Sequence, residues 1–138
     1  MLTRMQNPLA LTARMLMALL FLPEGVSKIV DFAGIASYIG SAAVPFPALA
    51  AIIAVVVEVV GSVALLAGLQ TRWVALIMCV FTLATAFLFH RFWTVPTDQV
   101  TIQQIMFFKN LAIAGGLLML AAFGAGAWSM DARLRQLI

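Results

Sequence analysis

Four long stretches of almost uninterrupted apolar residues dominate the pattern of the chain. A helix that spans a bilayer needs about 20 such residues, and each stretch is at least that long. The stretches lack the period-two alternation of barrel strands, so helices are the expected structure. The pattern therefore predicts an all-α membrane protein, a single transmembrane domain over residues 1–138 whose four-helix bundle is built from residues of about 9–30, 48–69, 73–93 and 102–124.

The connection between the first two predicted helices, about residues 31–47, is longer than the others. Phe32, Ile35, Tyr38 and Ile39 recur within it at helical spacing, which is typical of a segment that lies on a membrane surface. We therefore expect this connection to be partly helical. Pro45 and Pro47 should end any helix there before the second span begins.

Composition narrows the class of protein further. Of the 138 residues 64% are hydrophobic and 9% are charged, and the mean hydropathy is +1.12. A soluble domain carries about 25% charged residues, so a soluble fold is excluded. The net charge of only +3 comes without basic clusters, which argues against a nucleic-acid partner and leaves the lipid bilayer as the expected surroundings.

Basic residues predict the orientation of the bundle. With four spans, both termini and the turn after the second span lie on one side, and that side holds most of the arginines. By the positive-inside rule both termini should be cytoplasmic, with the 31–47 connection outside. Arg14 and Arg72 would then be anchors whose guanidinium groups reach the interface. The arginines on this side are Arg4, Arg14, Arg72, Arg133 and Arg135.

Charged side chains within the spans need a partner or a purpose, because burial of charge in a bilayer is costly. Glu24 and Lys28 are four residues apart and should share a helix face. Glu58 stands alone in the second span, about 15 Å from its outer end at 1.5 Å per residue. It lies on a stripe of mostly small residues that predicts a helix contact face: Ala51, Ala54, Glu58, Gly61, Leu65 and Gly68.

Six polar residues should fall in the outer half of the bundle, and we interpret them as one candidate intramembrane cluster. Simpler interpretations stay open: Lys28 and Lys109 could reach the interface, His90 could end a helix, and Glu58 could be a neutral structural acid. Lys109 shares a stripe with Ala112 and Gly116, which predicts that it faces a neighbouring helix. The cluster is Glu24, Lys28, Glu58, His90, Lys109 and Asn110.

The sequence predicts no metal site and no resident cofactor. It holds one His and one Cys, and neither stands in a spacing known for metal ligands. A single His supplies at most one strong axial ligand to haem. An autonomous enzyme is therefore less expected than a subunit of a larger assembly.

Several short motifs give the chain a resemblance to the DoxX family of small four-helix bacterial inner-membrane proteins. They are residues 21–28 (FLPEGVSK), Glu58 with Gly61, residues 68–72 (GLQTR), His90, and Lys109 with Asn110. Members of that family often carry His before the glycine of the first helix, where this chain has Glu24. The resemblance implies a bacterial inner-membrane location and an association with thiosulfate:quinone oxidoreductase or with other membrane-bound redox assemblies.

Three functions are compatible with these features. The first is a membrane subunit of a quinone-linked, sulfur- or thiol-related redox assembly, in which Lys109, Asn110 and His90 donate hydrogen bonds to a quinone and Glu58 carries protons. The second is a noncatalytic anchor that recruits a soluble oxidoreductase. The third is a small carrier for protons, ions or a polar solute, which would favour a homo-oligomer because four helices enclose little volume.

Overall fold

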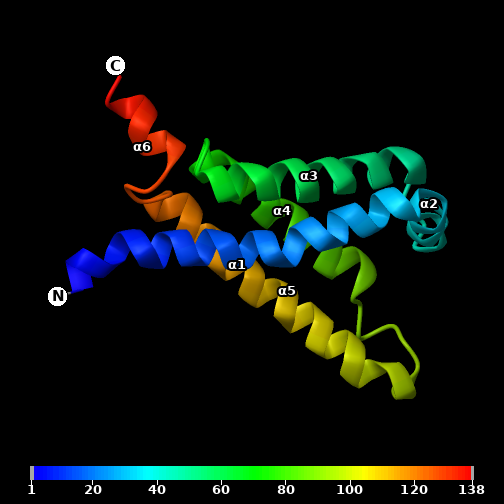
Figure 1. Ribbon diagram of the computed structural model, residues 1–138. Helices are drawn as coiled ribbons and strands as arrows, with labels where there is room; N and C mark the ends of the chain where they lie inside the picture. The colour runs from blue at the N-terminus through cyan, green and yellow to red at the C-terminus, as the bar shows by residue number, and fades with distance from the viewer. Residues whose placement is uncertain (1, 138) are drawn as a thin grey trace.

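The computed structural model describes residues 2–137, and within them the chain is helical, with no strand (Figure 1). Met1, Ile138 and the side chains of residues 2–4, which include Arg4, lie outside the described part. Four of the helices are long and apolar enough to cross a membrane, which confirms the predicted fold class. The helices are α1 (Leu2–Val30), α2 (Phe32–Ser41), α3 (Pro47–Ala67), α4 (Thr71–Phe89), α5 (Thr97–Phe123) and α6 (Met130–Arg135).

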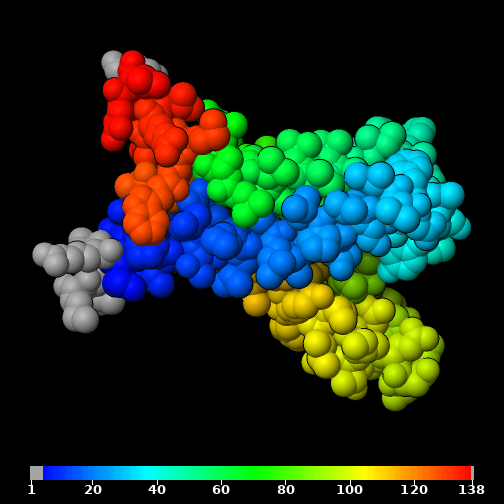
Figure 2. All heavy atoms as spheres, in the orientation of Figure 1, coloured from blue at the N-terminus to red at the C-terminus, as the bar shows by residue number. Residues whose placement is uncertain are grey.

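The four long helices pack as two pairs that separate at one end. α1 packs mainly on α3 and α4 on α5, whereas contacts between α1 and α5 are few. The pairs converge around a core that includes Phe21, Leu65, Met78 and Leu117. Toward its N-terminus α5 diverges from α1, and the spheres in Figure 2 show a notch between them. The bundle is therefore closed near the C-terminal segment and open near α2.

Several helix boundaries differ from the expected ones. α4 ends at Phe89 instead of continuing to residue 93, because the chain turns at His90, which is the C-cap of the helix. Phe92 and Trp93 fold back onto Phe107 with ring centroids 5.6 Å away in each case. α5 begins at Thr97, five residues before the apolar run. Hydropathy marks the part of a helix that can lie in lipid, and a helix can continue past it into polar residues.

The predicted helical segment in the 31–47 connection is confirmed by α2. Asp31 caps it, since its carboxylate accepts a hydrogen bond from the Gly34 N–H at 3.1 Å. α2 packs on α3 and buries Ile39, and Tyr38 stacks on Phe89 of α4 with centroids 5.5 Å apart. The helix thus joins the two pairs at the end where they separate.

At the opposite end, Arg14 is fully buried, so the interpretation of its side chain as an interfacial anchor is wrong. Its Nη1 donates to the carbonyls of Leu65 at 3.3 Å and Leu66 at 3.2 Å, and its Nη2 donates to the Trp128 carbonyl at 2.6 Å. The last carbonyls of a helix lack partners within it and carry the negative end of its dipole. The guanidinium satisfies them at the end of α3, which is why it turns inward.

Asp131 completes this arrangement from the C-terminal segment. Its two carboxylate oxygens accept hydrogen bonds from the N–H groups of Gln70 at 2.7 Å and Thr71 at 2.9 Å, where α4 begins. Its own N–H donates to the carbonyl of Gly68, which adopts a left-handed φ of 67°. We call Arg14, Asp131 and the turn over residues 68–71 the clamp. A cation thus caps the end of α3 and an anion the start of α4.

We expect Arg14→Met to lower the free energy of unfolding by about 2–3 kcal/mol, because the carbonyls of Leu66 and Trp128 lose the donor that Arg14 supplies. Arg72→Met is the matched control, since Arg72 is exposed. Thermal unfolding of the purified protein in detergent measures both. Equal midpoints for the two variants would contradict a structural role for Arg14.

Candidate functional site

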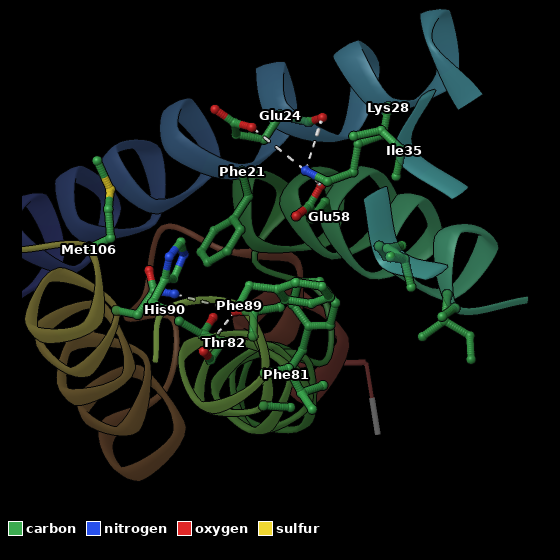
Figure 3. Close-up of a pocket in the computed structure, with 18 of the residues that line it drawn as sticks. Phe21, Glu24, Lys28, Ile35, Glu58, Phe81, Thr82, Phe89, His90 and Met106 are labelled. Atoms are coloured by element: carbon green, nitrogen blue, oxygen red, sulfur yellow. Dashed lines mark hydrogen bonds and ion pairs between the residues drawn. The ribbon is translucent and has the colours of Figure 1, made fainter. Parts of the chain in front are cut away.

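A cavity of about 510 Å³ lies between the two helix pairs, at the end where they separate (Figure 3). Five helices, α1 to α5, contribute to its walls, and most of the lining side chains are apolar. All six residues of the predicted cluster line it: Glu24, Lys28, Glu58, His90, Lys109 and Asn110. The six side chains come from α1, α3, α5 and the C-cap of α4 and lie around one cavity.

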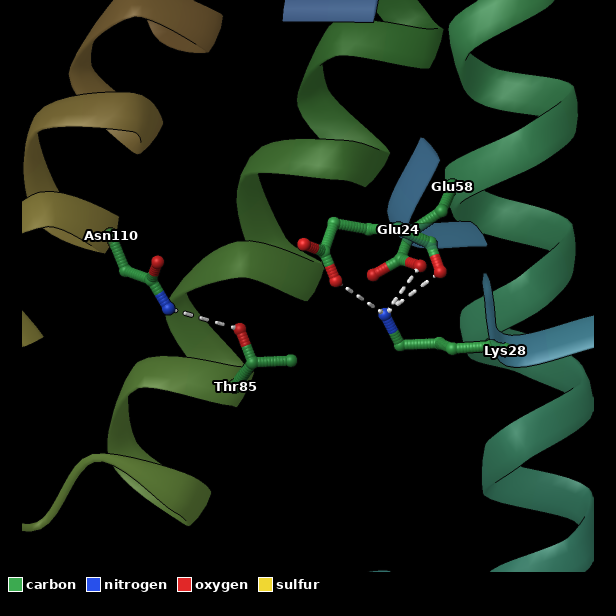
Figure 4. A network of polar contacts seen from close by, with 5 residues as sticks. All are labelled: Glu24, Lys28, Glu58, Thr85 and Asn110. Atoms are coloured by element: carbon green, nitrogen blue, oxygen red, sulfur yellow. Dashed lines mark hydrogen bonds and ion pairs between the residues drawn. The ribbon is translucent and has the colours of Figure 1, made fainter. Parts of the chain in front are cut away.

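Three charged side chains form an ion-paired group on the α1 and α3 wall, which we call the triad. Lys28 Nζ lies 2.8 Å from Glu58 Oε2 and 3.6 Å from Glu24 Oε2 (Figure 4). It also donates to the Glu24 carbonyl at 3.4 Å. Lys28 thus points into the bundle, contrary to the alternative that it reaches the interface. Glu58, which looks isolated in the sequence, has a cationic partner from the next helix in the bundle.

The stripe predicted along α3 is buried throughout, from Ala51 to Gly68. Gly25 of α1 meets this stripe closely: a Cβ at Gly25 would lie 2.9 Å from Glu58 Cβ and 2.7 Å from Val59 Cγ2. The absence of a side chain at Gly25 therefore lets α1 approach α3. That approach brings Lys28, less than one turn further along α1, within reach of Glu58.

The opposite wall, formed by α4 and α5, carries neutral polar groups. Asn110 Nδ2 donates to Thr85 Oγ1 at 3.4 Å, and Thr85 Oγ1 donates to the Thr82 carbonyl at 2.8 Å. Thr82 in turn donates to the Met78 carbonyl at 2.7 Å. Sequence reasoning missed both threonines, which line the cavity. Their spacing of three residues in an otherwise apolar helix was the available signal.

The remaining two predicted residues lie apart from the triad. His90 Nδ1 is 3.0 Å from Gln103 Oε1, a contact that ties the end of α4 to α5. Lys109 is exposed, and its Nζ contacts Met106 Sδ at 3.2 Å. The six residues thus share one cavity but belong to separate polar groups, without a single hydrogen-bonded network joining them among the described contacts.

The expectation that Lys109, Ala112 and Gly116 form a contact face of α5 is correct only for Gly116, where an added Cβ would clash with Met17 Cε of α1. Lys109 and Ala112 are exposed, and the buried face of this helix carries Phe107, Asn110, Ala114, Leu117 and Leu120 instead. Larger apolar side chains fill the space between α4 and α5, so small residues do not mark this interface. Within the described residues, no group of three or more His, Cys, Asp or Glu side chains could hold a metal ion.

A family model for DoxX matches residues 9–91, which covers α1 from its third turn through the end of α4. The chain belongs to the DoxX family. Two Escherichia coli (strain K12) relatives extend the likeness to nearly the whole length. Inner membrane protein YphA is 42% identical over 125 residues, 91% of this chain and 89% of that protein. Inner membrane protein YqjF is 41% identical over 126 residues, 91% of this chain and 92% of that protein.

The relatives and the four spanning helices make this DoxX protein an inner-membrane protein in contact with the lipid bilayer. No solved structure matches the chain. Two of the motifs behind the resemblance now have distinct places in the DoxX fold. Residues 21–28 contribute Glu24 and Lys28 to the cavity wall, whereas residues 68–72 include the turn whose N–H groups donate to Asp131 and whose Gly68 lies against the Arg14 guanidinium.

We expect Gly25→Ala to lower the free energy of unfolding by about 1–3 kcal/mol, because the added methyl group would force α1 away from α3. Gly115→Ala is the matched control, since a Cβ there meets nothing within 4 Å and should raise helix propensity. Unfolding in mixed detergent and sodium dodecyl sulfate micelles measures the difference. If Gly115→Ala is as damaging as Gly25→Ala, close α1–α3 packing is not the reason.

Proposed function

We propose that this DoxX protein is the membrane subunit of a quinone-linked redox assembly of the sulfur or thiol type, with the quinone headgroup in the cavity between the helix pairs. The observation that carries the proposal is the cavity itself. Its volume of about 510 Å³ is in the range of small-molecule sites, and a mainly apolar lining surrounds a few convergent polar groups.

The chemistry of the two walls suits a quinone. A quinone ring carries two carbonyl oxygens on opposite sides, and each needs a hydrogen-bond donor within an apolar slot. Lys28 on one wall and Asn110 on the other are donors from different helix pairs. Phe21, Phe81 and Phe89 supply aromatic surface for the ring. Glu58 lies beside Lys28 as an acid that can exchange the proton that quinone reduction requires.

The shape of the bundle supports access from the membrane. α1 and α5 make few contacts, and the notch between them separates two helices that are long and apolar enough to cross a membrane. Quinones reside in the bilayer, so a headgroup can enter sideways while its isoprenoid tail remains among the lipids. α2, with Ile35 and Tyr38 in the lining, covers the cavity at its open end.

Electron transfer then requires a partner protein. We assign the electron-carrying group to a soluble or membrane-bound partner and the quinone to this chain. We further propose that both termini are cytoplasmic, since Arg72, Arg133 and Arg135 lie at the clamp end of the bundle. The triad and α2 are then in the outer half of the membrane.

Bound quinone provides the test. The protein is extracted with its surrounding lipid by a styrene–maleic acid copolymer, and ubiquinone and menaquinone are quantified by chromatography. We expect bound quinone to exceed the bulk membrane ratio, and Asn110→Leu to weaken binding about tenfold through loss of one donor.

Gln104→Leu is the matched control, because Gln104 is an exposed amide on the same helix that does not line the cavity. It should leave bound quinone unchanged. Quinone at the bulk ratio in the wild-type protein would overturn the proposal and favour a noncatalytic anchor. Loss of quinone in both variants would show that the effect does not arise in the cavity.

A further inference from the structure

The triad joins an exposed acid to a buried one through a single cation. The side chain of Glu24 is 66% exposed, that of Lys28 is 18% exposed, and that of Glu58 is 7% exposed. The three functional groups therefore form a graded series from the surface of α1 to the interior of the cavity. Lys28 Nζ is the link, at 3.6 Å from one carboxylate and 2.8 Å from the other (Figure 4).

We propose that Glu24, Lys28 and Glu58 form a proton path that supplies the cavity from the surface of α1. The inference deepens the proposed function, on which it rests for the identity of the proton acceptor. A merely structural ion pair would need one acid for one lysine. Here a second carboxylate contacts the same ammonium group, and its side chain is exposed near the C-terminal end of α1.

The transfer proceeds in steps that balance. Lys28 gives a proton to the Glu58 carboxylate: an N–H bond breaks, an O–H bond forms, and a neutral amine faces a carboxylic acid. Glu24, protonated from outside, then returns a proton to the Lys28 amine and becomes a carboxylate again. Glu58 passes its proton to the quinone oxygen. Each cycle moves one proton inward and restores all three charges.

Two such cycles complete one reduction, in which the quinone takes up two electrons and two protons to become a quinol. The reductant we name is a thiol pair on the partner protein, which forms a disulfide, gives two electrons to the quinone and releases its two protons to the water around the partner. The electrons come from the partner and the protons from the triad, so neither side of the balance is left open. This chain's own residues handle protons alone.

The other ionisable groups that line the cavity lie on different helices from the triad. Tyr38 comes from α2, His90 follows α4, and Lys109 comes from α5. The polar lining residues within α4 are Thr82 and Thr85, which do not ionise. His90 and Lys109 contact Gln103 and Met106, respectively. Among the described residues, the charged side chain that pairs with Glu58 is Lys28, so proton exchange at Glu58 should pass through that residue.

The test follows the carboxylic-acid C=O stretch of Glu58 by time-resolved infrared spectroscopy after a pH jump. The protein is kept in its native lipid with its quinone, and the band is assigned by its loss in Glu58→Gln. We expect Glu24→Gln to slow the response about a hundredfold. Glu24→Asp should restore it, because a carboxyl group is regained. Glu24 is exposed, so these changes should not prevent folding.

Asp98→Asn serves as the control, because it removes an acid from the first turn of α5 outside the cavity lining. It should leave the rate unchanged. An unchanged rate in Glu24→Gln, or a wild-type protein that shows no Glu58 band at any pH, would overturn the path. Bound quinone is measured in the same samples. A slowed response in Glu24→Gln, in protein that holds no quinone, would support the proton path and overturn the quinone proposal. Bound quinone with an unchanged rate in Glu24→Gln would support the quinone proposal and overturn the path.

Discussion

The buried guanidinium of Arg14 is the contact on which the shape of the bundle depends. It connects α1 to the end of α3 and to the Trp128 carbonyl of the C-terminal segment, three parts of the chain that are far apart in sequence. With one end of the bundle fixed in this way, the helix pairs can diverge at the other without coming apart. The cavity is thus a geometric consequence of a clamp at the opposite end of the same helices.

The bilayer explains why charges in this protein gather in groups. A lone charge near the membrane centre is costly, and hydrogen-bonded partners lower that cost. Arg14 finds backbone carbonyls at a helix end, whereas Glu58 finds Lys28 across the α1–α3 contact. The first arrangement binds backbone carbonyls through both terminal nitrogens of the guanidinium and holds the fold together. The Lys28–Glu58 pair has another acid, Glu24, and a cavity beside it. A site that exchanges protons requires both features.

Much of this architecture could be predicted from the sequence. Hydropathy located the four spans, helical spacing located α2, and the stripe around Glu58 gave the buried face of α3. The partner of Glu58 could not be predicted, because contact between α1 and α3 depends on the close approach at Gly25. The burial of Arg14 was missed for a related reason: its acceptors are backbone carbonyls, which no residue type reveals. On α5, larger side chains such as Phe107 and Leu117 form most of the buried face, and of the predicted stripe only Gly116 lies against another helix.

The notch between α1 and α5 has a consequence for how much affinity the site needs. A ligand that enters from the bilayer is already confined to a hydrocarbon layer about 30 Å thick. Its amount per unit area of membrane therefore determines the occupancy of the site. Partitioning concentrates an apolar molecule in that layer far above its cellular average. Modest contacts within the cavity can then keep it filled.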